Sequence, residues 1–90
     1  MAVIKKKILK VYFDQVASGK KKYELRLGDF EVQEGDILVL EEWDKESESY
    51  TGRTIEKKVT HVGTFKLEDI YAFWKKERIE EHGLQIISIE

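Results

Sequence analysis

A charged stretch between Gly19 and Arg26, called the charged octet below, holds the residue types best suited to chemistry in this chain. It reads Gly-Lys-Lys-Lys-Tyr-Glu-Leu-Arg, so lysines, a glutamate and an arginine follow one another closely. On a strand, Glu24 and Arg26 would share one face about 7 Å apart, because alternate side chains point the same way. An arginine paired with a carboxylate keeps spare donors for a phosphate or another carboxylate. The pair therefore indicates either an anion-binding cleft or a salt bridge that fixes the loop.

The lysines of the charged octet differ in where they can point. Strict alternation on a strand would turn Lys21 away from Glu24. Lys21 can join the cleft only if the strand begins after it, in a bend that follows Gly19. We expect that bend, because glycine adopts the left-handed conformation that ends a helix. We expect Lys20 and Lys22 to be solvated lysines that add to the local field.

The net charge of −2 conceals an uneven distribution along the 90 residues. Up to Arg26 there are eight lysines and arginines against two acidic residues, and beyond it eight against sixteen. Such a division favours an N-terminal surface for an anion, with phosphate as the obvious candidate. Lysines that merely keep an edge strand in solvent would give the same pattern. The length is that of one domain, residues 1–90, without linker or repeat.

The amino-acid composition excludes several classes of metal and covalent site and favours a cellular location in the cytoplasm. Without cysteine there is no disulfide framework, thiolate zinc site or cysteine nucleophile, and two histidines are too few for a histidine cage. We therefore expect no metal and no cofactor. The longest apolar run is residues 37–40, far below a membrane span, and lysines precede any stretch of signal-peptide length. We expect a cytoplasmic protein with no membrane partner.

Hydrophobic periodicity predicts the elements that position the charged octet. The order is β-α-β-β-β-α-β, an α+β chain with a polar loop over residues 44–52. We expect a mixed, strongly curved sheet or open barrel flanked by two helices. The expected strands are Val3–Leu9, Tyr23–Leu27, Ile37–Trp43, Arg53–Val62 and Leu84–Ile89, and the helices are Leu9–Ala17 and Leu67–His82.

The first two thirds of the chain resemble the ASCH (activating signal cointegrator homology) domain. The motif of that family is glycine, any residue, lysine, two residues of any kind, glutamate, any residue, arginine. Residues 32–43 and 50–53 further resemble a small subgroup of ASCH-like proteins from bacteria, archaea and phages. The motif positions are Gly19, Lys21, Glu24 and Arg26.

The resemblance implies a PUA-like mixed β-barrel of about five to six strands flanked by two helices, with a cleft beside the charged octet. It also implies a role in binding RNA or nucleotides. Some proteins similar to this family are amidohydrolases of acetylated cytidine that use a lysine and a threonine of the motif. The lysine position is Lys21, but the threonine position is Glu24, and a carboxylate cannot supply that hydroxyl nucleophile.

We therefore expect an RNA- or nucleotide-binding module, in which lysines follow the phosphates and aromatic rings stack on bases. A small hydrolase of modified nucleosides or RNA is one alternative, with Lys21 and Glu24 as its catalytic residues. A protein-interaction module that uses the acidic C-terminal two thirds is another. Whether the chain is an enzyme stays open at this stage. The expected ligand-binding residues are Lys21, Glu24, Arg26, Lys7, Trp43 and Tyr50.

Overall fold

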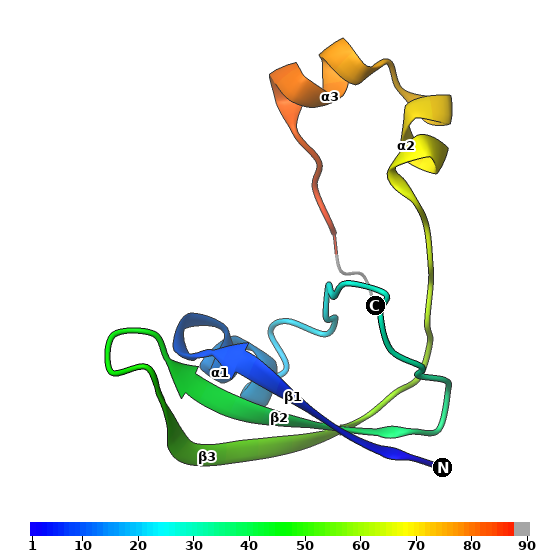
Figure 1. The fold of residues 1–90 in the computed structure, drawn as a ribbon. Helices are drawn as coiled ribbons and strands as arrows, with labels where there is room; N and C mark the ends of the chain where they lie inside the picture. The colour runs from blue at the N-terminus through cyan, green and yellow to red at the C-terminus, as the bar shows by residue number, and fades with distance from the viewer. Residues whose placement is uncertain (88–90) are drawn as a thin grey trace.

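A three-stranded open sheet forms the body of the molecule, with one helix against it and two helices held apart (Figure 1). The computed structural model describes residues 1–87 of the chain. The result is a small α+β architecture. Its elements are β1 (Val3–Leu9), α1 (Lys10–Ala17), β2 (Ile37–Asp44), β3 (Ser49–Lys58), α2 (Leu67–Phe73) and α3 (Lys76–His82).

Strand β2 lies in the middle of the sheet, between β1 and β3. It runs parallel to β1, with Val3 opposite Ile37, and antiparallel to β3. A parallel pair needs a crossover connection, and α1 with the charged octet belongs to that connection. The sequence of β2 explains its central place, because residues 37–40 are apolar on both faces.

The core lies between α1 and one face of the sheet. Phe13 and Val16, three residues apart on α1, turn one helix face onto β1 and β2, where they meet Ile8 and Leu40. Leu40 is completely buried. Leu38 and Ile55 extend this cluster along the sheet. The predicted strands over residues 3–9 and 37–43 and the predicted helix ending at Ala17 are confirmed.

Strand β3 begins at Ser49, earlier than predicted, and contains a bulge opposite Glu42. Glu41 pairs with Thr54 while Trp43 pairs with Tyr50, so residues 51–53 all face Glu42. Gly52, in the middle of the bulge, has a φ of 94°, a left-handed conformation that favours glycine. The bulge therefore places three residues of β3 opposite Glu42 where a regular ladder would place one, and two of them, Thr51 and Arg53, donate hydrogen bonds to it.

The predicted barrel of five to six strands is wrong, because the sheet is open and has three strands. Residues 23–27 form no strand, and residues 84–87 are also irregular; Ser88 and Ile89, which the predicted last strand included, lie outside the described residues. Alternation in sequence shows which side chains share a side of the chain. It does not show that a neighbouring strand is present to complete the ladder.

The predicted single helix over residues 67–82 is divided into α2 and α3. The break falls at Trp74, whose backbone is extended with φ −134° and ψ 140°. Neither helix has a buried residue, and Figure 1 shows both standing away from the sheet. Short helices are marginal without tertiary packing, so a long helical pattern does not guarantee one continuous helix. Within residues 1–87, no helix is long and apolar enough to cross a membrane.

Two substitutions test where the core ends. Leu40→Ala should lower the free energy of unfolding by about 3 kcal/mol, because it leaves a cavity under α1. Phe73→Ala, at a residue 79% exposed, should change it by less than about 0.5 kcal/mol. Urea denaturation measures both. A loss of stability in Phe73→Ala comparable to that in Leu40→Ala would contradict the separation of α2 and α3 from the core.

Candidate ligand-binding site

The charged octet begins in a bend that ends α1. Gly19 has a φ of 80°, and its N–H donates to the carbonyl of Val16 at 3.1 Å. The N–H of Lys21 then donates to the carbonyl of Gln15 at 2.9 Å, so the chain folds back against the helix. The predicted bend after Gly19 is confirmed, and it turns the Lys21 side chain toward Glu24.

Glu24 is the centre of a cluster with Lys21 and Arg26. Its Oε2 accepts a hydrogen bond of 2.7 Å from Nε of Arg26, and Nη2 of the same guanidinium also lies 2.7 Å away. Its Oε1 lies 3.7 Å from Nζ of Lys21. The Glu24 side chain is only 17% exposed. The structure thus brings together the three residues at the centre of the sequence prediction.

A pocket of about 210 Å³ opens at this cluster, beside the edge of β1. Tyr12 stands in its wall, and Nζ of Lys21 lies 4.6 Å from the centroid of that ring. The Tyr23 ring is 5.0 Å from the same ammonium. Both distances are typical of cation–π contacts, which hold the lysine between aromatic faces. The pocket is lined by Lys7, Ile8, Leu9, Tyr12, Lys21, Glu24, Leu25 and Arg26.

Trp43 and Tyr50 form a second group, which does not line this pocket. They face each other across β2 and β3, with ring centroids 4.9 Å apart and an edge-to-face angle of 80°. Nζ of Lys7 lies 3.7 Å from the centroid of the Trp43 ring and 5.9 Å from that of Tyr50. Lys7 also lines the pocket of Glu24, so it is the one predicted residue that connects the two groups.

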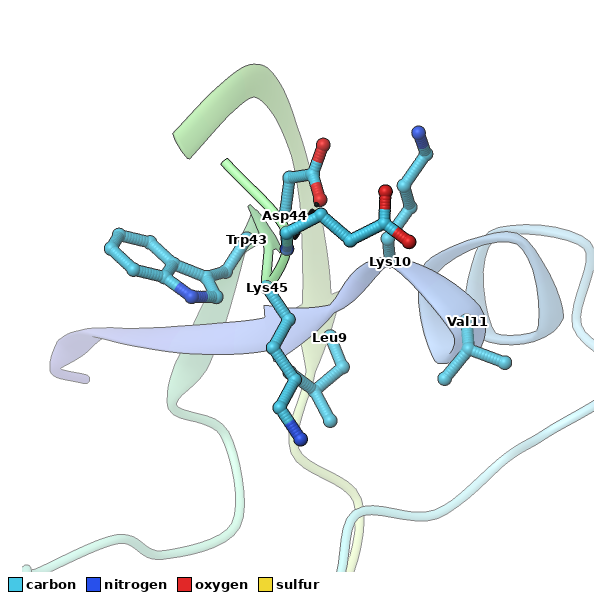
Figure 2. A pocket seen from close by; sticks show the side chains of 7 residues that line it. Leu9, Lys10, Val11, Trp43, Asp44 and Lys45 are labelled. Carbon is cyan, nitrogen blue, oxygen red and sulfur yellow. Dashed lines mark hydrogen bonds between the residues drawn. The ribbon is translucent and has the colours of Figure 1, made fainter. Parts of the chain in front are cut away.

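A second hollow, of about 270 Å³, lies at the carboxyl ends of β1 and β2. Figure 2 shows Trp43 and Val11 at its opposite sides, with Asp44 and Lys10 above Leu9. Lys45 and Glu46 complete its lining, which therefore contains two lysines and two carboxylates. This balanced charge gives the hollow no preference for an anion or a cation.

A charge network that the sequence analysis missed lies beneath α1. Glu42 is 2% exposed, and both its oxygens accept hydrogen bonds from Arg53: Nε to Oε1 at 3.0 Å and Nη2 to Oε2 at 2.6 Å. The hydroxyl of Thr51 also donates to Oε1, at 2.5 Å. Arg53 reaches α1 as well, through a 3.2 Å bond to Asp14 and a position 4.4 Å from the centroid of the Phe13 ring.

These contacts determine the protonation of Glu42. Hydrogen bonds from Arg53 and then Thr51 lower its pKa from 4.5 to about 2, although burial acts in the opposite direction. The same pairing raises the pKa of Arg53 above its usual value. Glu42 and Arg53 are therefore both charged at neutral pH. A sequence signal was present, because alternation from Leu38 and Leu40 places Glu42 on the buried face of β2.

Asp36 is a second buried carboxylate, 3% exposed, at the start of β2. The backbone N–H of Ala2 donates to its Oδ1 and that of Gln33 to its Oδ2, each at 2.9 Å. These bonds lower the pKa of Asp36, with the bond from Ala2 as the largest cause. They tie the N-terminus to the turn before β2. Across residues 1–87, no three His, Asp or Glu side chains gather to hold a metal ion.

Comparison with known proteins supplies a family and no activity. A family model described as "Domain of unknown function (DUF3850)" matches residues 4–74. Over 51 residues the chain is 43% identical to the "Uncharacterized 12.9 kDa protein in GpA 3'region" of Escherichia phage P2. The aligned part is 57% of this chain and 45% of the phage protein. No solved structure matches significantly. The resemblance to the ASCH domain therefore stays a prediction.

The two buried carboxylates predict how stability depends on pH. Because the folded pKa of Glu42 is about 2 and its ordinary value is 4.5, its contribution is complete above about pH 5. It is lost as pH falls from 4.5 toward 2, because the unfolded chain takes up the proton first. Asp36 acts in the same direction. Urea titrations from pH 7 to pH 2 should show this loss.

Glu42→Gln isolates one of these carboxylates. It should lower the midpoint of thermal unfolding at pH 7 by on the order of 10 °C, because it leaves Arg53 without its buried partner. It should also make the loss of stability in acid shallower. Glu80→Gln is the matched control, since Glu80 is exposed on α3 and pairs only loosely with Lys76, at 3.9 Å. An acid profile unchanged in Glu42→Gln would show that the carboxylate is not the titrating group.

Proposed function

This chain belongs to the DUF3850 family, and we propose that it is a small RNA- or nucleotide-binding module whose ligand enters the pocket around Glu24. The observation that supports this most is the cluster itself. Lys21, Glu24 and Arg26 meet at one pocket of about 210 Å³ beside an exposed strand edge. A salt bridge that served only to fix the loop would not need a lysine on its other side and an open space next to it.

The charge around the pocket suits a polyanion. Lys7 lines the pocket, and the exposed lysines Lys20 and Lys22 flank Lys21 in the chain. Arg26 keeps part of its guanidinium accessible, with a side chain 27% exposed. Lysines and arginines gathered in this way attract phosphates at long range and release counterions on binding. We therefore expect the affinity for RNA to fall steeply as the salt concentration rises.

Aromatic rings near the pocket supply surfaces for bases. Tyr12 stands in the pocket wall and is 42% exposed. Tyr50, which is 53% exposed, packs against Trp43, and the ammonium of Lys7 lies over the Trp43 ring. Single-stranded nucleic acids stack on such rings along a basic groove. The predicted resemblance to the ASCH domain also supports RNA or a nucleotide as the ligand. We place the protein in the cytoplasm, where RNA and nucleotides are present.

Arg26→Ala tests the proposal. Fluorescence anisotropy with a labelled single-stranded RNA at low salt should show affinity reduced by about tenfold, with a shallower dependence on salt by roughly one charge. Arg78→Ala is the control, because Arg78 is an exposed arginine on α3, 3.8 Å from Glu81. Undetectable binding of RNA, DNA and nucleotides at low salt, or equal affinity for the two variants, would overturn the proposal.

A further inference from the structure

The chain beyond β3 contains an arm with a large exposed apolar surface. This C-terminal arm, residues 65–87, includes α2, α3 and the irregular residues that follow them. Leu67 and three aliphatic residues within 84–87 are exposed. An exposed apolar surface of this extent is typical of a surface that another molecule covers. Four aromatic residues of the arm are between 43% and 79% exposed: Phe65, Tyr71, Phe73 and Trp74.

The two helices of the arm lack the packing that short helices need. Each has seven residues, and an isolated helix shorter than about 12–15 residues is marginal in water. Neither has a buried residue, and Figure 1 shows both away from the sheet. The Phe73 and Trp74 rings lie with their centroids 6.0 Å apart, and both remain exposed. Within residues 1–87, the chain therefore does not itself cover this surface.

The charges of α3 run opposite to the order that stabilises a helix by itself. Three basic residues and one acidic residue in 75–78 give a net charge of +2, and two acidic residues in 79–82 give −2 with a neutral histidine. A helix carries partial positive charge at its N-terminus and partial negative charge at its C-terminus. Glu77 and His82 have the favourable order, but they do not outweigh Lys75, Lys76, Glu80 and Glu81.

An antiparallel copy of the same helix matches this charge distribution. About a two-fold axis near Ile79, the basic half of each helix lies beside the acidic half of the other, whereas a parallel copy would bring like charges together. The ion pairs within one copy are loose, at 3.9 Å for Lys76 and Glu80 and 3.8 Å for Arg78 and Glu81. These side chains can therefore turn to a partner.

We propose that the C-terminal arm is a dimerisation surface. On it, α3 packs antiparallel against α3 of a second copy of this chain, and the exposed aromatic residues of the two arms cover one another. This inference goes beyond the proposed function and is independent of it, because none of the residues that line the pocket of Glu24 belongs to the arm.

The apolar area of the arm is of the size that such a dimer needs. At roughly 150–250 Å² for each aromatic side chain, the four exposed aromatic residues present roughly 350–600 Å² per arm. The exposed aliphatic residues add to this area, and a specific interface buries about 800 Å² per partner. Part of the binding free energy is spent on ordering two short helices, so we expect a dissociation constant in the micromolar range.

Sedimentation velocity on the unaltered chain, from about 1 to 200 μM, measures this association. The mass should rise with concentration from that of one chain to that of two. The stability comparisons of Phe73→Ala and Glu80→Gln refer to the monomer and are made below the dissociation constant. A single chain at every concentration would overturn the proposal.

Two double variants test the antiparallel pairing. Lys75→Glu with Lys76→Glu makes both halves of α3 acidic, and Glu80→Lys with Glu81→Lys makes both halves basic. Each variant alone should dimerise about tenfold more weakly at low salt, because attraction between the helices becomes repulsion. An equimolar mixture of the two should recover the affinity of the unaltered chain, because an acidic helix then faces a basic one.

Recovery in the mixture excludes misfolding as the cause of the loss, and a mixture as weak as the separate variants would overturn the pairing. Glu31→Lys with Glu34→Lys is the matched control, since both residues are exposed before β2 and the change in net charge is the same as in the basic variant. This control should dimerise like the unaltered chain. An equal loss in the control would show that net charge alone opposes association and would also overturn the pairing.

Phe73→Ala tests the apolar part of the surface. It should weaken the dimer by about tenfold, because buried aromatic residues dominate the energetics of interfaces, and should leave the circular dichroism of the sheet unchanged. Tyr50→Ala is the control, at an exposed aromatic residue of β3 outside the arm, and should leave the dimer intact. A dimer that is unaffected by Phe73→Ala, or one lost in Tyr50→Ala, would place the interface elsewhere and overturn the proposal.

Discussion

The buried carboxylate of Glu42 is the point on which the rest of the molecule depends. It lies on the same face of β2 as Leu40, almost without contact with solvent, and a lone charge there would be very costly. Arg53 and Thr51, both brought to it by the bulge of β3, satisfy its two oxygens. Arg53 then continues to Asp14 and Phe13 on α1. One side chain of β3 therefore joins β2, β3 and the helix.

The pocket depends on this junction through α1. Phe13 is held under the helix by the core and by Arg53, and the next residue toward the N-terminus, Tyr12, stands in the pocket wall. At the other end of α1, Gly19 turns the chain so that Lys21 meets Glu24. If α1 shifted on the sheet, both the aromatic wall and the ammonium would move relative to Glu24. The core and the network of Glu42 thus set the geometry of the pocket, and Ile8 belongs to both the core and the pocket wall.

The sequence predicted well those features of the fold that depend on residues close together in the chain. Apolar spacing placed β1, α1 and β2, and Gly19 placed the bend that turns Lys21. The barrel was wrong, because the alternation over residues 23–27 arises where Arg26 pairs with Glu24 rather than on a sheet. The network around Glu42 was missed because it needs a bulge on another strand, and the position of a bulge follows from pairing register.

Two glutamates pair with an arginine in this chain, and they differ in how completely their oxygens are hydrogen-bonded. Glu42 has every oxygen satisfied, and the hydrogen bonds outweigh burial to keep it ionised. Glu24 accepts from Arg26 at one oxygen and leaves the other buried without a hydrogen bond. A buried unsatisfied acceptor lowers stability, so the pair of Glu24 and Arg26 stabilises the fold less than the pair of Glu42 and Arg53 does. The two carboxylates therefore differ in how completely they are bonded, since both oxygens of Glu42 have donors and only one oxygen of Glu24 does.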